Sequence, residues 1–153
     1  MSVLMLFRVC ALSLLLAAGD GTGDGGPPPV AVVHDAVKVD VLTGREFRRV
    51  FLGTQERWAD GERVVLVLPP PGSPEMQWLC DELRVSERLY RRGLMEKALR
   101  GDIHKPLQAR DVKHALELAA ATVGAIAPVS PTQADRVYAA GDEVGLVRLG
   151  EER

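Results

Sequence analysis

The residues best suited to chemistry stand at the start of a predicted helix, where the sequence reads Gly72-Ser73-Pro74-Glu75. Serine is a favoured N-cap, proline is favoured at the first helical position, and an acidic residue suits the first turn. Free backbone N–H groups and the positive end of the helix dipole allow such a terminus to bind an anion, with the serine hydroxyl as a further donor. Gly72 and Ser73 are therefore candidate anion-binding residues, although a structural N-cap is the more frequent role of serine at this position.

Thr43 begins another predicted helix, and the same two roles are open to it. Glu46 follows three residues later, which is the spacing of a capping box, and Leu42 and Phe47 fit the hydrophobic staple that accompanies one. Thr43 is therefore a further candidate anion-binding residue. The capping box favours its structural role.

The other reactive residue types form no recognisable site. His34, His104 and His114 are far apart and show no metal-ligand pairing, so no metal site is expected. Cys80 lies on an apolar helical face without a base nearby, as buried structural cysteines do. No catalytic triad order, nucleotide-binding loop or carboxylate pair stands out, so the sequence predicts a protein that is not an enzyme and that has no cofactor.

The elements that must position these residues alternate between strands and helices. Continuous apolar runs predict buried strands, and apolar residues at i, i+3 and i+4 predict helices with one buried face. Strands are expected at Val30–Val33, Val64–Leu68 and Ala125–Val129, and helices after the caps Thr43, Ser73 and Ser86 and near Ala109–Ala121. This order predicts an α/β domain over residues 30–150, with a mixed or mostly parallel sheet flanked by helices.

The spacing also predicts which side chains are buried and how the chain ends. A terminal hairpin is expected from residues 137–140 and 144–149, joined at Gly141-Asp142. Trp58 is expected to be a packing anchor. Helical core positions are expected at Phe47, Val50 and Phe51, at Met76, Leu79, Cys80 and Leu83, and at Val112, Ala115, Leu116 and Ala119.

The first 29 residues are expected to lie outside the folded domain. Residues 1–19 have the apolar run and small final residues of a secretory signal, and residues 20–29 form a Gly- and Pro-rich linker. The expected location is therefore periplasmic or secreted. The net charge of −2 argues against a nucleic-acid partner, because general nucleic-acid binders carry a basic field.

Several motifs occur in a characteristic order. They are Phe-x-x-Val-Phe-Leu-Gly at 47–53, Trp-x-Asp-Gly at 58–61, a strand, a Pro-rich turn, Ser-Pro at 73–74, and Gly-Ala-Ile at 124–126 leading into a strand. In this order the chain resembles the phosphate ABC-transporter solute-binding protein family, particularly its short, single-lobe relatives. The similarity covers roughly Val30 to Val129.

The resemblance implies a fold like one lobe of a type II periplasmic binding protein, and binding of phosphate or another oxyanion for uptake or sensing. Because a single lobe cannot enclose a ligand, the lobe would need a partner such as an ABC-transporter permease or an envelope protein, a second copy of the chain, or else a weak, open site. Phosphate-binding relatives use a Ser-Gly-Thr loop at Ser73, with an arginine shortly before it. Here Pro74 removes one N–H donor, and Pro69–Pro71 stand in place of the arginine.

That departure keeps a second interpretation open, in which the lobe has lost its ligand and acts as an interaction or accessory module of an envelope complex. A small hydrolase on the same scaffold would need a nucleophile and a base that the sequence does not show.

Overall fold

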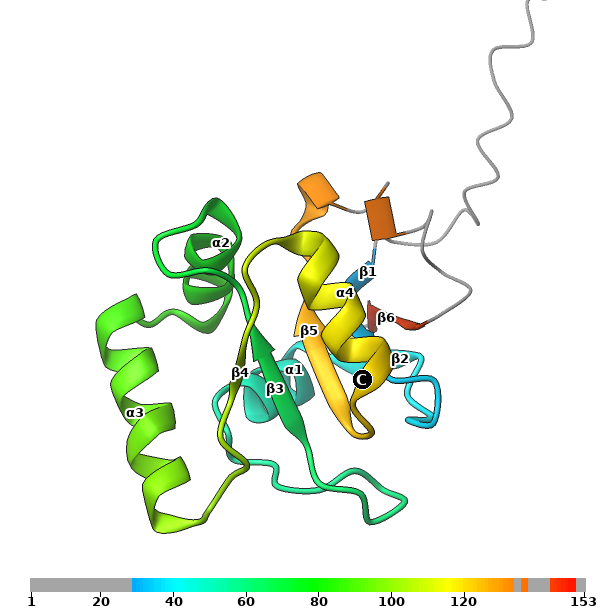
Figure 1. Ribbon diagram of the computed structural model, residues 1–153, viewed down its shortest axis with the longest axis horizontal. Helices are drawn as coiled ribbons and strands as arrows, with labels where there is room; N and C mark the ends of the chain where they lie inside the picture. The colour runs from blue at the N-terminus through cyan, green and yellow to red at the C-terminus, as the bar shows by residue number, and fades with distance from the viewer. Residues whose placement is uncertain (1–28, 134–135, 138–143, 151–153) are drawn as a thin grey trace, which may run out of the picture.

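The computed structural model describes residues 29–133, 136–137 and 144–150 (Figure 1). The predicted signal at 1–19 and the predicted linker up to residue 28 lie outside the described residues. Within the described residues, no helix is long and apolar enough to cross a lipid bilayer.

The centre of the domain is a six-stranded sheet in the order β2-β6-β1-β5-β3-β4. β1 is antiparallel to β5 and β6, whereas the pairs β3–β5, β3–β4 and β2–β6 are parallel, so the sheet is mixed, as predicted. The strands are β1 (Pro29–Val33), β2 (Val41–Thr43), β3 (Val65–Leu68), β4 (Leu107–Gln108), β5 (Ala125–Pro128) and β6 (Gly145–Gly150).

Helices cover both faces of this sheet, which explains why its central strands are continuous apolar runs. Successive side chains of a strand point to opposite faces, and along β3 Leu66 and Leu68 join the core under α1, α2 and α3. Val65 and Val67 join the core under α4 on the other face, where α4 lies across β5 (Figure 1). The helices are α1 (Gly44–Phe51), α2 (Pro74–Leu83), α3 (Glu87–Arg100) and α4 (Val112–Ala121), with a 3-10 turn at Pro131–Gln133.

Three of these helices follow the predicted signals. Phe47, Val50 and Phe51 of α1 are buried, as are the four predicted core residues of α2. Gly53 follows the end of α1 with a φ of 68°, and Gly101 caps α3 with a φ of 80°. Trp58 is buried, as expected for an anchor, and its indole N–H donates to the carbonyl of Gly124 at 2.9 Å.

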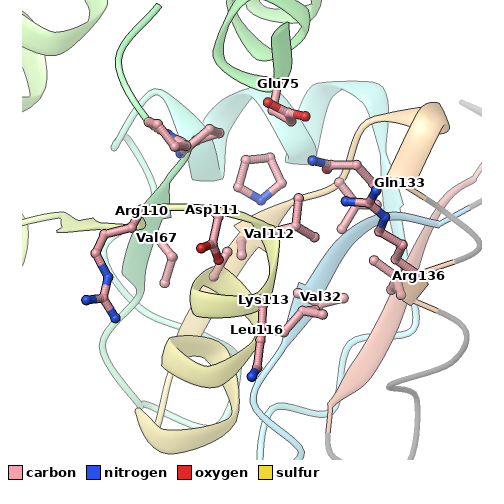
Figure 2. Close-up of a pocket in the computed structure, with 17 residues that line it drawn as sticks. Val32, Val67, Glu75, Arg110, Asp111, Val112, Lys113, Leu116, Gln133 and Arg136 are labelled. Carbon is pink, nitrogen blue, oxygen red and sulfur yellow. The ribbon is translucent and has the colours of Figure 1, made fainter. Parts of the chain in front are cut away.

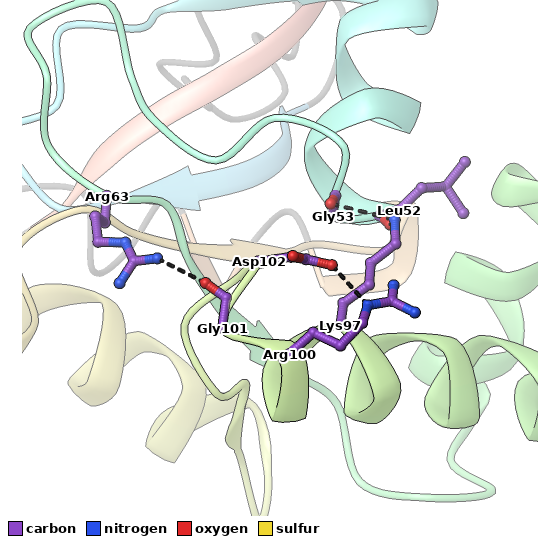
Figure 3. Close-up of polar contacts among 7 residues, drawn as sticks. All are labelled: Leu52, Gly53, Arg63, Lys97, Arg100, Gly101 and Asp102. Atoms are coloured by element: carbon purple, nitrogen blue, oxygen red, sulfur yellow. Dashed lines mark hydrogen bonds and ion pairs between the residues drawn. The ribbon is translucent and has the colours of Figure 1, made fainter.

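Polar contacts of α3 tie it to the rest of the domain (Figure 3). The Lys97 ammonium donates to the carbonyls of Leu52 and Gly53 at 2.8 and 3.2 Å, at the negative end of the α1 dipole. The Arg63 guanidinium donates to the carbonyl of Gly101, just after α3, at 3.3 Å. These contacts hold the outermost helix against α1 and the loop before β3.

Two sequence-based predictions need correction. The terminal hairpin is not formed: β6 pairs with β1 on one side and β2 on the other, and Arg136–Val137 are helical, while residues 138–143 lie outside the described part of the chain. Pairing with β1 and β2 places β6 inside the sheet, and this pairing outweighs the local preference for a turn at Gly141-Asp142. The last helix begins at Val112 rather than near Ala109, because Asp111 is its N-cap.

Candidate functional site

Ser73 and Gly72 lie at the start of α2, as predicted, and their polar groups bind within the protein. Ser73 Oγ accepts a hydrogen bond from the N–H of Met76 at 3.1 Å, and Ser73 N–H donates to the carbonyl of Pro70 at 3.1 Å. The N–H of Gly72 faces both carboxylate oxygens of Glu87, each at 3.2 Å. A carboxylate of the protein therefore already lies against the donor predicted to bind an anion.

Thr43 forms the predicted capping box. Its Oγ1 accepts from the N–H of Glu46 at 3.2 Å and donates to Glu46 Oε2 at 3.0 Å, while its own N–H donates to Oε2 at 2.8 Å. These two hydrogen bonds to the Glu46 carboxylate lower its pKa. Thr43 ends β2, and three strands separate β2 from β3, so the structure does not bring Thr43 together with Gly72 and Ser73.

A cavity of about 380 Å³ lies beside the start of α2, at the carboxyl ends of β3 and β5 (Figure 2). Pro69 and Pro70 follow β3 into it, and Pro128 ends β5 there. Ligand sites of open α/β sheets occur at the carboxyl ends of parallel strands, where helices also begin. Here α2 contributes Glu75 from its first turn, and α4 contributes its whole N-terminus.

The cavity has an apolar wall and a charged rim. The side chains of β1, β3 and β5 and of α4 form most of the wall. The lining residues are Val32, Val67, Pro69, Pro70, Glu75, Arg110, Asp111, Val112, Lys113, Ala115, Leu116, Ala127, Pro128, Val129, Gln133, Arg136 and Val137. Val112, Ala115 and Leu116, predicted as core positions, are only partly buried because they face this space, whereas Ala119 is fully buried.

The N-terminus of α4 offers free donors to the cavity. Asp111 caps the helix by accepting from the N–H of His114 at 2.8 Å. The N–H groups of Val112 and Lys113 come before the first intrahelical bonds, and they have no acceptor among the described residues. This helix start therefore keeps two donors and a positive dipole end for a ligand.

Gln133 brings a further polar side chain to the cavity. Its side chain is 6% exposed, and its Oε1 accepts from the N–H of Ser130 at 3.2 Å. The amide nitrogen has no acceptor within the described part of the chain, and Figure 2 shows the side chain reaching toward the middle of the cavity. Arg136 also lines the cavity, and Figure 2 draws it at the same end as Gln133, whereas Arg110 and Lys113 point away from the centre.

The rim carries three cations, Arg110, Lys113 and Arg136, against the two carboxylates of Glu75 and Asp111, a formal charge of +1. These residues were not predicted from the sequence, because the last helix was expected to begin before Asp111. Asp111 is a favoured N-cap residue, and the helix that it starts leads into the strand β5. Helix starts and the carboxyl ends of parallel strands lie at the same edge of a sheet, so Asp111 was the signal that could have located the site.

No group of three or more His, Cys, Asp and Glu side chains able to hold a metal ion occurs among the described residues. Burial raises the pKa of the Cys80 thiol, which disfavours the reactive thiolate.

Comparison with known proteins gives similarity at the level of structure alone. No protein-family model and no curated protein matches the chain. A phosphate ABC transporter substrate-binding protein of Clostridium perfringens, solved with bound phosphate, superposes with a TM-score of 0.58 at 14% identity, over 80% of this chain and 44% of that one. PstS of Borrelia burgdorferi superposes with a TM-score of 0.60 at 10% identity, over 82% of this chain and 48% of that one. An ABC-type phosphate transport receptor of Vibrio cholerae superposes with a TM-score of 0.51 at 17% identity, over 80% of this chain and 46% of that one.

The chain thus spans just under half the length of each of these proteins. They are binding and transport proteins by description, and identities of 10 to 17% establish likeness of fold alone. The mixed sheet with helices on both faces is therefore the fold of one lobe of such a substrate-binding protein.

Proposed function

We propose that this domain is a solute-binding lobe, without enzymatic activity, that holds a small anion in the cavity between the starts of α2 and α4. The observation that carries the proposal is the convergence of the Gln133 amide, the Arg136 guanidinium and the free N–H groups of α4 on one cavity. An anion could accept hydrogen bonds from all three kinds of donor. The likeness to phosphate-binding proteins supports the same ligand class.

The cavity is a better place for the anion than Gly72 and Ser73. An anion at Gly72 would have to displace the Glu87 carboxylate, and the Ser73 hydroxyl already accepts from Met76. The nearby Pro70 and Glu75 line the cavity, so the predicted anion site and the proposed one are neighbours.

The proposed cellular location rests on the N-terminal sequence. Residues 1–19 suggest export, which would place the domain in the periplasm or outside the cell. The cavity is open on one side, so a permease, an envelope protein or a second copy could close it, as the second lobe does in a two-lobed binding protein.

Calorimetric titration of the full chain with phosphate and with acetate, at low ionic strength, tests the proposal. We expect saturable binding that Arg136→Gln weakens about tenfold, because a hydrogen bond to a charged group contributes about 1.5 kcal/mol. Arg92→Gln, which removes the same charge from the exposed face of α3, should leave the affinity unchanged. Absence of binding and of thermal stabilisation by both anions would refute the proposal, because a bound ligand raises stability by mass action.

Ser73→Ala locates the site. If the anion lies in the cavity, this change lowers stability by about 1 kcal/mol through loss of the N-cap and leaves anion affinity unchanged. Loss of affinity would instead place the anion at Gly72 and Ser73.

A second candidate function, an interaction module without a small ligand, is favoured by the outer face of α3. Leu89 and Leu99 are 66% and 81% exposed there, and Met95 is also exposed. Exposed apolar side chains grouped on one helix are typical of protein contact surfaces. The same titration decides between the two functions, since the module requires no anion binding.

A further inference from the structure

The cavity proposed as the anion site has far more apolar wall than an inorganic anion can use. Val112, Ala115 and Leu116 of α4 line it and are only partly buried, whereas the lining residues Val32 of β1 and Val67 of β3 are fully buried beneath the surface. A tetrahedral oxyanion presents only polar oxygens, and facing them with apolar side chains costs free energy unless each oxygen is hydrogen-bonded. The wall therefore suits a ligand that has apolar surface of its own.

The size of the cavity leads to the same conclusion. Its volume of about 380 Å³ equals that of about a dozen water molecules in the liquid. Phosphate has five non-hydrogen atoms and would leave most of this space to water. Sites for organic ligands begin at about 300 Å³ and combine a mainly apolar lining with a few placed polar groups.

The polar groups that point inward are gathered at one end. Gln133 and Arg136 both line the cavity and are drawn at the same end of it, whereas Arg110 and Lys113 point away from the centre (Figure 2). A ligand with one anionic head group could bind the Gln133 amide and the Arg136 guanidinium while the rest of it covers the apolar side chains of α4. The Gln133 amide nitrogen has no acceptor in the described part of the chain and reaches toward the middle of the cavity, so it marks where a head-group oxygen would bind.

The charges of the rim favour a single negative charge on the ligand. Two carboxylates, Glu75 and Asp111, line the same cavity, so a dianion there would meet more repulsion than a monoanion. Hydrogen phosphate, mostly a dianion above neutral pH, fits these charges less well than a carboxylate.

We propose that the cavity binds a small organic monoanion with an apolar tail, a short-chain to medium-chain carboxylate, in preference to an inorganic oxyanion. The proposal rests on the proposed function, because both assign the same donors to an anionic group. It adds the apolar wall as the part of the site that selects the ligand.

The test is a titration of the full chain with acetate, butyrate and hexanoate, with hexanamide as the neutral analogue and phosphate as the inorganic anion. Affinity should rise about fourfold for each methylene that becomes buried, which corresponds to about 0.8 kcal/mol. Hexanoate should therefore bind at least tenfold more tightly than phosphate, which has no methylene. It should also bind at least tenfold more tightly than hexanamide, whose neutral head group lacks the charge-assisted hydrogen bond to the Arg136 guanidinium.

Two variants assign the two ends of the ligand. Gln133→Glu keeps the acceptor for Ser130 N–H but replaces the donor by a negative charge, so all carboxylates should lose at least tenfold in affinity. Leu116→Ser shortens the apolar wall and should flatten the rise from acetate to hexanoate. Leu118→Ser is its matched control, because Leu118 packs against the same core without lining the cavity.

The outcomes separate this proposal from the proposed function. Phosphate or acetate binding without any gain from chain length overturns the organic-anion proposal and leaves the anion-binding lobe intact. Hexanamide binding as tightly as hexanoate, with no effect of Gln133→Glu, overturns both, since the cavity would then take neutral apolar molecules. Absence of binding by every probe also overturns both, provided that each variant retains the thermal unfolding transition of the native chain.

Discussion

Two glycines with the same backbone conformation should respond differently to alanine. Gly101 and Gly124 both have a φ of 80°, in the left-handed region that L-residues other than glycine rarely adopt. A Cβ at Gly101 meets no atom within 4 Å, whereas a Cβ at Gly124 would overlap the carbonyl oxygen of Arg63. The pair therefore separates backbone strain from steric overlap.

The expected magnitudes follow from these surroundings. Gly101→Ala introduces strain alone, about 1 kcal/mol of lost stability. Gly124→Ala adds the cost of moving the backbone at Arg63, about 1 to 3 kcal/mol, which gives a total of about 2 to 4 kcal/mol. The shift would also strain the hydrogen bond from the Trp58 indole to the Gly124 carbonyl, at 2.9 Å. The positive φ and the close Arg63 carbonyl thus explain why the Gly-Ala-Ile motif begins with glycine.

Urea denaturation of the two variants and the native chain, followed by tryptophan fluorescence, measures the difference. Trp58 is buried, so its emission reports the same region. We expect the midpoint of Gly124→Ala to fall at least twice as far as that of Gly101→Ala, with similar m-values. Equal losses of stability would refute the argument, because they would mean that the Arg63 carbonyl does not restrict this position.

The remaining predictions concern α1. Lys97→Met removes the cation from the carbonyls at the end of α1 and should lower the free energy of unfolding, measured by urea denaturation, by about 1 to 2 kcal/mol. The control Arg92→Met breaks an exposed i,i+4 ion pair and should lower it by about 0.5 kcal/mol or less. Equal losses in the two variants would contradict this prediction. Glu46→Gln tests the capping box through pH. Because hydrogen bonds from Thr43 lower the Glu46 pKa in the folded chain, the carboxylate stabilises the fold above its unfolded pKa of about 4.3, and this contribution is lost as the pH falls through the lower folded value. The native chain should therefore exceed Glu46→Gln in stability at pH 7 and lose that advantage as the pH falls through the folded pKa of Glu46; an advantage that does not shrink on acidification would contradict the argument.

Local signals predicted most of the elements because their causes are local. The Thr43 and Glu46 spacing gave the capping box, and Ser73 with Pro74 gave the start of α2. Gly53 and Gly101 marked helix ends that need a positive φ. In each of these places a few neighbouring residues satisfy one another's hydrogen bonds or backbone geometry, so no knowledge of distant contacts was needed.

The last strand was predicted within one residue at each end, but its pairing partner was mispredicted for the opposite reason. Gly141-Asp142 between two apolar runs favours a hairpin locally, yet β6 pairs with β1 and β2, which lie about a hundred residues earlier in the chain. Strand pairing of this kind depends on which apolar faces the whole sheet can bury, and a turn signal carries no information about that.

At the candidate site, too, some features follow from local sequence and others only from the tertiary structure. The sequence alone determined the helix starts at Thr43 and Ser73, the buried strands and the α/β order, because capping and periodicity act over three or four residues. Only the tertiary structure decided that Glu87 takes the Gly72 donor and that Gln133 and Arg136 meet the start of α4 at one cavity. Those groups are far apart in the chain, and they come together because parallel strands bring their carboxyl ends to one edge of the sheet.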